Sequence, residues 1–123
     1  MCCGYPDRLD NLDDPKAPKE CYFELAEAID QSCIDAISIE DAHLNNDLSL
    51  LKPFKSKKII LVVVCVARSR IETADEIQVR LTEALKYIDA ERLIASPDCK
   101  LGLLGRNLAI AKLNNLCQAA KSL

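Results

Sequence analysis

The stretch Ile59-Ile60-Leu61-Val62-Val63-Val64-Cys65-Val66 decides the fold, because these consecutive apolar and mostly β-branched residues leave neither face of a strand for water. A strand that is apolar on both faces is typical of the centre of a parallel sheet, which is covered on both sides. We therefore expect a central parallel strand over 59–66 in a protein of α/β class.

Helical and strand patterns alternate on both sides of this strand. Before it, apolar residues recur at helical spacing over 20–31, 34–39 reads as a short buried strand, and Asn46 or Asp47 caps a brief helix over 48–51. After it, Thr73 with Glu76 forms a capping box for a helix reaching Ile88, followed by a strand over 92–96 and a helix over 106–121. The expected buried stripes are Tyr22, Leu25, Ala26 and Ile29 in the first helix, Ile77, Leu81, Ala84, Leu85 and Ile88 in the second, and Ala109, Leu113, Leu116 and Ala120 in the last. This order predicts parallel strands joined by right-handed crossovers.

Composition limits the class of protein. The chain has 123 residues and a net charge of -3, so it lacks the broad positive field that nucleic-acid binding needs. It has no run of about 20 apolar residues and its first residues do not form a signal peptide, so we expect a soluble cytoplasmic protein that does not enter the membrane.

A sheet of three parallel strands is too narrow to cover itself and leaves its edges open to hydrogen bonding. The chain is also shorter than the roughly 250 residues typical of a closed (β/α) barrel. We therefore expect a partial, half barrel of three to four parallel strands, forming one domain over 1–123, that self-associates as a homo-oligomer through its exposed edges.

The seven cysteines are odd in number and lack the spacing of a disulfide framework, which indicates reduced thiols. Four of them lie in or beside apolar periodic segments, where cysteine acts as a small hydrophobic residue. These four, expected to serve packing, are Cys21, Cys33, Cys65 and Cys117; Cys2, Cys3 and Cys99 stay candidates for chemistry.

Two candidates stand where strands end. Glu40 follows Ala36-Ile37-Ser38-Ile39, and Cys99 belongs to the turn Pro97-Asp98-Cys99 after the strand over 92–96. In α/β sheets and barrels, functional groups sit on the loops that follow strands. Position and residue type together therefore select Glu40 and Cys99.

Three segments at strand ends carry a family resemblance. Cys2-Cys3-Gly4-Tyr5-Pro6-Asp7, Ile37-Ser38-Ile39-Glu40 and Ser96-Pro97-Asp98-Cys99 resemble, in order and spacing, the carboxyl-terminal part of cobalamin-independent methionine synthase. The resemblance implies a TIM-type barrel with zinc held by a His-x-Cys pair, a Glu and a later Cys. It also implies methyl transfer from methyltetrahydrofolate to homocysteine.

Carried onto this chain, the resemblance implies that Cys2, Glu40 and Cys99 are metal ligands and that Asp98 orients the site by hydrogen bonding. These residue types suit zinc, which takes thiolate, imidazole and carboxylate ligands. A substrate thiol loses its proton more readily at such a site, because the ion stabilises the thiolate.

The chain departs from the family pattern where the histidine ligand is expected, since Met1 occupies the middle of His-x-Cys. The one histidine, His43, follows Glu40 by three residues and either approaches the metal or is a polar surface residue. Cys3 is a second candidate to replace the missing histidine ligand. Lys100 stands where the family usually has glycine, and Ala67 lies where the longer enzymes place a proton-donating histidine.

The basic residues Arg68 and Arg70 follow the central strand. They either hold a carboxylate, such as the glutamate tail of a folate, or are solvated loop residues.

Three hypotheses stay open. The first is a zinc-dependent methyltransferase domain that acts with a complementary segment, the second is a catalytically silent truncated remnant that self-associates, and the third is a metal-free thiol module using Cys2, Cys3 and Cys99. In the first two, the 123 residues alone are not expected to complete the reaction.

Overall fold

The computed structural model describes residues 4, 6–11, 13, 15–98 and 101–123. Helical and strand elements alternate as the sequence predicts. Their bounds are α1 Glu20–Asp30, β1 Ala36–Glu40, the 3₁₀ helix η1 Leu48–Leu51, β2 Lys58–Val64, α2 Ala74–Ala84, η2 Ala90–Arg92, β3 Leu93–Pro97, η3 Leu101–Leu103 and α3 Arg106–Lys121.

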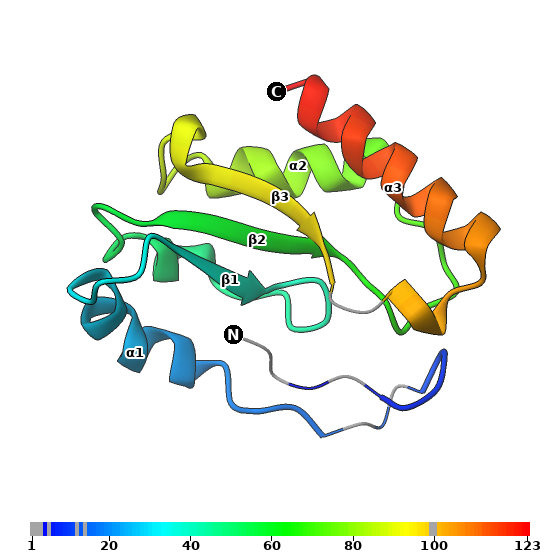
Figure 1. Cartoon of the computed structure of the whole chain (residues 1–123), viewed down its shortest axis with the longest axis horizontal. Helices are drawn as coiled ribbons and strands as arrows, with labels where there is room; N and C mark the ends of the chain where they lie inside the picture. Colours follow the sequence, from blue (N-terminus) through cyan, green and yellow to red (C-terminus); the bar gives the residue numbers. More distant parts are fainter. Residues whose placement is uncertain (1–3, 5, 12, 14, 99–100) are drawn as a thin grey trace.

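The strands form a parallel sheet in the order β1-β2-β3, with the apolar strand β2 in the centre (Figure 1). In the register, Ile39 of β1 lies opposite Leu61 of β2, and Leu61 lies opposite Ala95 of β3. The pairing of β2 with β3 shifts between Val62 and Val64, near the carboxyl end of the strands. All three strands therefore end at one edge of the sheet.

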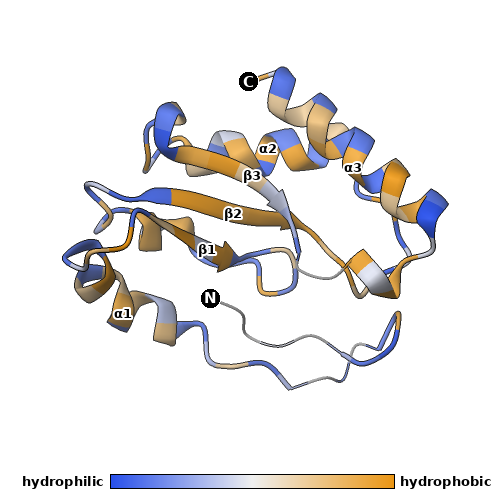
Figure 2. Cartoon of the chain, viewed as in Figure 1, coloured by the Kyte–Doolittle hydropathy of each residue, from blue (hydrophilic) through white to orange (hydrophobic). Residues whose placement is uncertain are grey.

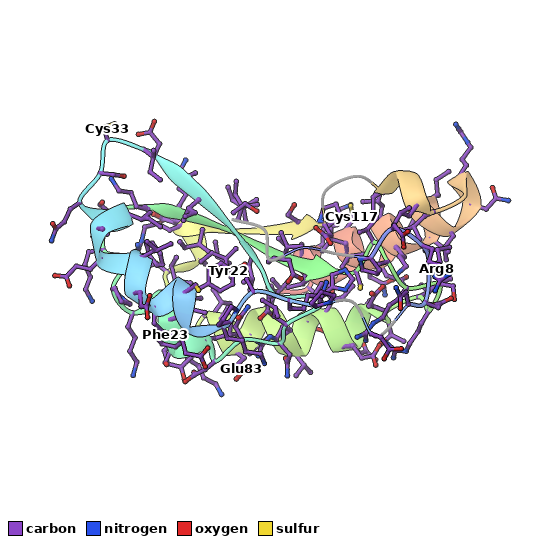
Figure 3. All side chains as sticks on the ribbon, turned by 90° about the horizontal axis from the view of Figure 1, so that it is seen from below. Arg8, Tyr22, Phe23, Cys33, Glu83 and Cys117 are labelled. Carbon is purple, nitrogen blue, oxygen red and sulfur yellow. The ribbon has the colours of Figure 1, made fainter. Side chains whose placement is uncertain are left out.

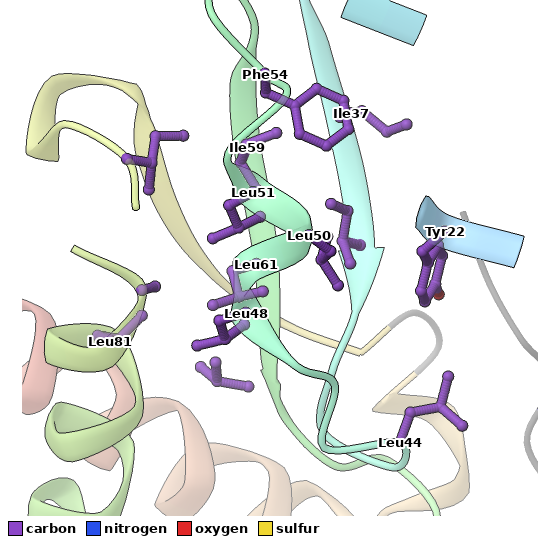
Figure 4. Close-up of a cluster of buried hydrophobic side chains, with 14 of the residues drawn as sticks. Tyr22, Ile37, Leu44, Leu48, Leu50, Leu51, Phe54, Ile59, Leu61 and Leu81 are labelled. Atoms are coloured by element: carbon purple, nitrogen blue, oxygen red, sulfur yellow. The ribbon is translucent and has the colours of Figure 1, made fainter. Parts of the chain in front are cut away.

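One face of the sheet is packed against helices. Ile39 and Leu61 belong to a buried cluster that includes the leucines of η1 and Leu81 of α2. Figure 4 shows Leu61 beside these leucines. Figure 3 shows α2 lying along this side of the sheet. The core residues on this face come mainly from odd-numbered strand positions, as the two-residue period of a strand requires.

The opposite face is covered less. Ser38, Ile60 and Ile94 are register partners across the three strands, yet Ser38 and Ile60 are only half-buried and Ile94 is 42% exposed. Glu40, Val62 and Ser96 form the next row on this face. Glu40 therefore stands on the less covered face, at the edge where the strands end.

The capping box at the start of α2 is confirmed. The Thr73 hydroxyl accepts a hydrogen bond from the Glu76 N–H at 3.2 Å, and Glu76 Oε2 accepts from the Thr73 N–H at 2.9 Å. The helix ends at Ala84 rather than at Ile88, but Ile88 is still buried against the core.

Several predicted core positions are wrong. Leu25 is 47% exposed because α1 buries only the narrow stripe of Tyr22 and Ala26. Ala120 is exposed, whereas Lys112 and Ala119 are buried with Leu116, so the buried face of α3 is rotated from the expected one. The predicted strand over 34–39 begins only at Ala36.

The expected packing role of four cysteines holds for one of them. Cys65 is buried, but Cys21, Cys33 and Cys117 are exposed. Cys21 and Cys117 lie on the outer faces of their helices, and Cys33 lies in the turn before β1.

Hydropathy follows the same layering, with apolar residues along β2 after Lys58 and mixed stripes on α2 and α3 (Figure 2). Within the described part of the chain, every helix is too short or too polar to cross a lipid bilayer.

Candidate metal centre

The site is built from residues at the carboxyl ends of the outer strands. Glu40 is the last residue of β1, and Asp98 comes directly after β3, where its N–H donates to the carbonyl of Val64 at 2.9 Å. Both carboxylates are buried, with exposed fractions of 2% and 4%. Two other expected ligands, Cys2 and Cys99, lie outside the described residues. The same is true of Cys3 and Lys100.

His43 joins these two carboxylates. One ligand atom each from Glu40, His43 and Asp98 lie within 4.8 Å of one another. The backbone N–H of His43 donates to Glu40 Oε1 at 2.6 Å, and the ring Nε2 of His43 lies 3.2 Å from Asp98 Oδ2. The side chain of His43 is only 5% exposed, so the alternative of a polar surface histidine is wrong. The loop after β1 turns back onto the ends of the strands and buries the ring of His43 there.

Glu40 is held in an unusual state for a carboxyl group. Burial raises its pKa, and the hydrogen bond from the His43 N–H opposes this only in part. Its Oε1 is used by that bond, while Oε2 is buried and has no hydrogen-bond partner among the described residues. A buried oxygen without a donor is an acceptor still available for a cation or a polar ligand.

The surroundings of His43 favour its charged form. Burial lowers its pKa, but the contacts with Asp98 and with Cys65, together with the charge of Glu40, outweigh burial and raise the pKa to about 9. The centre of the cluster therefore stabilises positive charge.

Cys65 completes the surroundings of the ring. Its Sγ lies 3.1 Å from Nδ1 and 3.0 Å from Nε2 of His43. Its N–H donates to Glu72 Oε1 at 3.1 Å, and its carbonyl accepts from Lys112 Nζ at 2.8 Å. Lys112 is fully buried and also pairs with Glu72 Oε2 at 3.0 Å. Side chains from outside the sheet thus fix the carboxyl end of β2.

The loop after Glu40 is fixed in a similar way. Arg80 of α2 donates from Nε and Nη2 to the two carboxylate oxygens of Asp41, at 2.6 and 2.8 Å. Asn46 donates from Nδ2 to the Glu40 carbonyl at 2.7 Å, and Asn45 turns the loop with a φ of 48°. This loop carries His43, so the Arg80 clamp holds the ring in register with Glu40.

The expected carboxylate-binding role of Arg68 and Arg70 finds little support. Arg70 lines a hollow of about 770 Å³, but it pairs with Glu76 and is mostly exposed. The lining of this hollow is predominantly acidic, with Asp41, Asp47, Glu72, Glu76 and Glu83 against Arg70 and Arg80. Arg68 is exposed. A binding site for a carboxylate tail would need an excess of positive charge.

Comparison with known proteins identifies the family of this chain. A family model described as the catalytic domain of cobalamin-independent synthase matches residues 18–122. The chain belongs to the cobalamin-independent methionine synthase family. A solved B12-independent methionine synthase from Shewanella sp. W3-18-1, in complex with selenomethionine, has 33% identity and a TM-score of 0.78 over 82% of this chain. The expectation of a partial TIM-type barrel of α/β class is confirmed.

Curated relatives agree with the family. The methionine synthase of Pyrococcus abyssi is 36% identical over 101 residues, which are 81% of this chain and 30% of that protein. The 5-methyltetrahydropteroyltriglutamate–homocysteine methyltransferase of Buchnera aphidicola subsp. Schizaphis graminum is 36% identical over 110 residues, 84% of this chain and 14% of that protein. The chain likewise covers 30% of the Shewanella structure, so it spans less than a third of these relatives.

Sequence reasoning missed the residues that support the synthase-family site. Cys65 directly follows β2, and a position at the carboxyl end of a strand was a signal for more than packing. Lys112 lies on the same helical face as Leu116, four residues away, and a lysine in an apolar stripe indicates a buried partner. Its partner, Glu72, carried no signal of its own in the sequence.

Proposed function

We propose that this chain carries the zinc-binding part of a methyltransferase that moves a methyl group from methyltetrahydrofolate polyglutamate to the thiol of homocysteine. The proposal takes 1–123 as one domain that forms the carboxyl-terminal half of a catalytic barrel. It takes Cys2, Glu40 and Cys99 as metal ligands. The observation that carries it is Glu40, which is buried at the carboxyl end of β1 with Oε2 unpartnered among the described residues, in a chain of the synthase family.

The described residues fit a zinc ion. Zinc takes carboxylate and imidazole ligands as well as thiolate, and Glu40 and His43 offer the first two within one cluster. Asp98 places a second carboxylate beside them. An ion bound there supplies positive charge that stabilises a thiolate over a thiol, so that homocysteine can react near neutral pH.

The chain's own residues hold this site and exclude water from it. The Arg80 clamp on Asp41 fixes the loop after Glu40, and the pair of Glu72 and Lys112 fixes the end of β2. Glu40 and Asp98 are almost fully buried, so a charge placed between them acts in a medium of low dielectric constant, where electrostatic attraction is stronger than in water.

The metal content of the protein tests the proposal. After purification without chelator, we expect about one zinc per chain by elemental analysis, and its loss in both Glu40→Gln and Cys99→Ser. Glu27→Gln is the matched control, because Glu27 is exposed on α1. In the unmodified chain, homocysteine should slow the removal of zinc by a chelator. If zinc is retained in Glu40→Gln, the proposed ligand set is wrong.

A second candidate is a silent domain that self-associates as a homo-oligomer. It is supported by the two outer strands β1 and β3, each of which has one neighbouring strand among the described residues, and by the exposed side chain of Ile94. Parallel edge strands of this kind readily pair with another copy. This candidate predicts a zinc-free dimer in sedimentation, and a monomer at micromolar concentration contradicts it.

A further inference from the structure

The cluster of Glu40, His43 and Asp98 contains a complete set of three donors in the described residues. Two are carboxylates and one is an imidazole, and all three side chains are almost fully buried. The strongest electrostatic influences on Glu40 come from one positive group, His43, and from two negative ones, Asp98 and Asp41. Asp41 is already paired with Arg80, so Glu40 and Asp98 are the two carboxyl groups placed beside His43 in this cluster.

We propose that His43 is the nitrogen ligand of a divalent metal ion held together with Glu40 and Asp98. The inference rests on the proposed function only in sharing Glu40. It assigns a histidine ligand from the loop after β1 and a carboxylate ligand from the end of β3.

One pair of donors already has the spacing of ligands on a tetrahedral ion, and the Glu40 donor lies within 4.8 Å of both. Two ligands of tetrahedral zinc, bound at about 2.0–2.1 Å, lie roughly 3.3 Å apart. His43 Nε2 lies 3.2 Å from Asp98 Oδ2, so an ion enters between them with little movement of either side chain. Glu40 contributes Oε2, the oxygen that has no hydrogen-bond partner among the described residues.

Two of the three proposed ligands, Glu40 and His43, are held by further contacts within the cluster. Glu40 Oε1 accepts from the His43 N–H, and His43 Nδ1 lies 3.1 Å from Cys65 Sγ. The sulfur lies equally close to the other ring nitrogen, at 3.0 Å from Nε2, so it contacts the ring as a whole and restricts how the ring can turn. Cys65 therefore acts as a positioning residue.

The position of Cys65 is itself built in. Its N–H and carbonyl are bound by Glu72 and Lys112, so the sulfur stays against the ring. The loop bearing His43 is tied to α2 through Asp41 and Arg80. The site is thus preorganised from both sides.

The single histidine gives a direct test. In the ¹⁵N-labelled full chain, freed of any affinity tag, imidazole nitrogen signals report His43 alone. The metal-free protein is titrated with Zn²⁺ and with ¹¹³Cd²⁺. We expect one ion per chain, a large shift of the Nε2 signal and a one-bond coupling between ¹¹³Cd and that nitrogen. A purely structural histidine would not show the coupling.

Variants separate ligand from support. His43→Gln should weaken Zn²⁺ binding more than about 100-fold, and Cys65→Ser by roughly 10- to 100-fold, as expected for a residue that orients a metal ligand. Cys117→Ser, at an exposed thiol, should leave binding unchanged.

The possible outcomes also separate this inference from the proposed function. Metal that binds without affecting the His43 nitrogens, but is lost in Cys99→Ser, overturns the inference and leaves the proposed function standing. Coupling to His43 with unchanged binding in Cys99→Ser supports the inference and overturns the proposed ligand set. The absence of any metal binding overturns both.

Discussion

Removal of the buried amine of Lys112 tests how the carboxyl end of β2 is held. Lys112→Met keeps most of the aliphatic stem but removes the donor to the Cys65 carbonyl and the cation beside Glu72. A buried acceptor left without a donor costs about 1–3 kcal/mol. Breaking a buried ion pair from one side costs about 3–5 kcal/mol.

The two contributions overlap, and the Glu72 side chain is 15% exposed, so water compensates it in part. We therefore expect a loss of about 3 kcal/mol in the free energy of unfolding, a large share of the roughly 5–15 kcal/mol of a typical domain. The corresponding fall in melting temperature is on the order of 10 °C.

The assay is urea denaturation followed by far-UV circular dichroism, with Lys121→Met as the control at an exposed position of the same helix. The control should change stability by less than about 0.5 kcal/mol. Adding Glu72→Gln to Lys112→Met should recover about 1–2 kcal/mol, since the double variant no longer leaves an unpaired charge. A loss below about 1 kcal/mol in Lys112→Met, or no recovery in the double variant, refutes the ion-pair argument.

Three further perturbations test other parts of the fold. Arg80→Ala leaves the buried Asp41 without its partner and should lower the free energy of unfolding, measured by urea denaturation, by about 3 kcal/mol. Arg68→Ala, at an exposed arginine, should lower it by almost nothing. Equal effects of the two substitutions would contradict the role of the Arg80–Asp41 pair. Leu50→Ala removes a fully buried side chain and should cost about 2–5 kcal/mol, against less than about 0.5 kcal/mol for Val79→Ala at a 70% exposed site; a small loss at Leu50 would mean that η1 is not part of the core. The hydrogen bonds from Thr73, with the charge of Arg70, lower the pKa of Glu76, so its contribution is present above the ordinary value of 4.5 and is lost as pH falls through the lowered pKa. Glu76→Gln should therefore flatten the acid side of a stability profile measured by thermal unfolding at several pH values, and an unchanged slope argues against the capping box.

The sequence was sufficient for the elements that depend on local pattern. The apolar run over 59–66 predicted the central strand, and Thr73 with Glu76 predicted the start of α2. The strand ends at Val64, two residues early, because the backbone groups of Cys65 bind Glu72 and Lys112 instead of a neighbouring strand. That partnership joins segments far apart in the chain and leaves no local pattern.

The candidate site was predictable only in part for the same reason. Glu40 could be selected because it ends a strand, and a strand end is visible in the sequence. The role of His43 depends on Asp98 and Cys65, each of which directly follows another strand of the sheet. Helical periodicity assigned the buried face of α3 from apolar residues alone and missed Lys112, because a buried ion pair looks polar in a pattern of hydropathy.

The parallel order of the sheet also determines when the cluster forms during folding. Each neighbouring pair of strands closes over a crossover, and such non-local pairing makes folding slow. Glu40 and Asp98 come from the two outer strands, so the three donors meet only after both outer strands have docked on β2. We therefore expect an ion bound by this cluster to stabilise contacts that form late in folding, and so to slow unfolding more than it accelerates refolding.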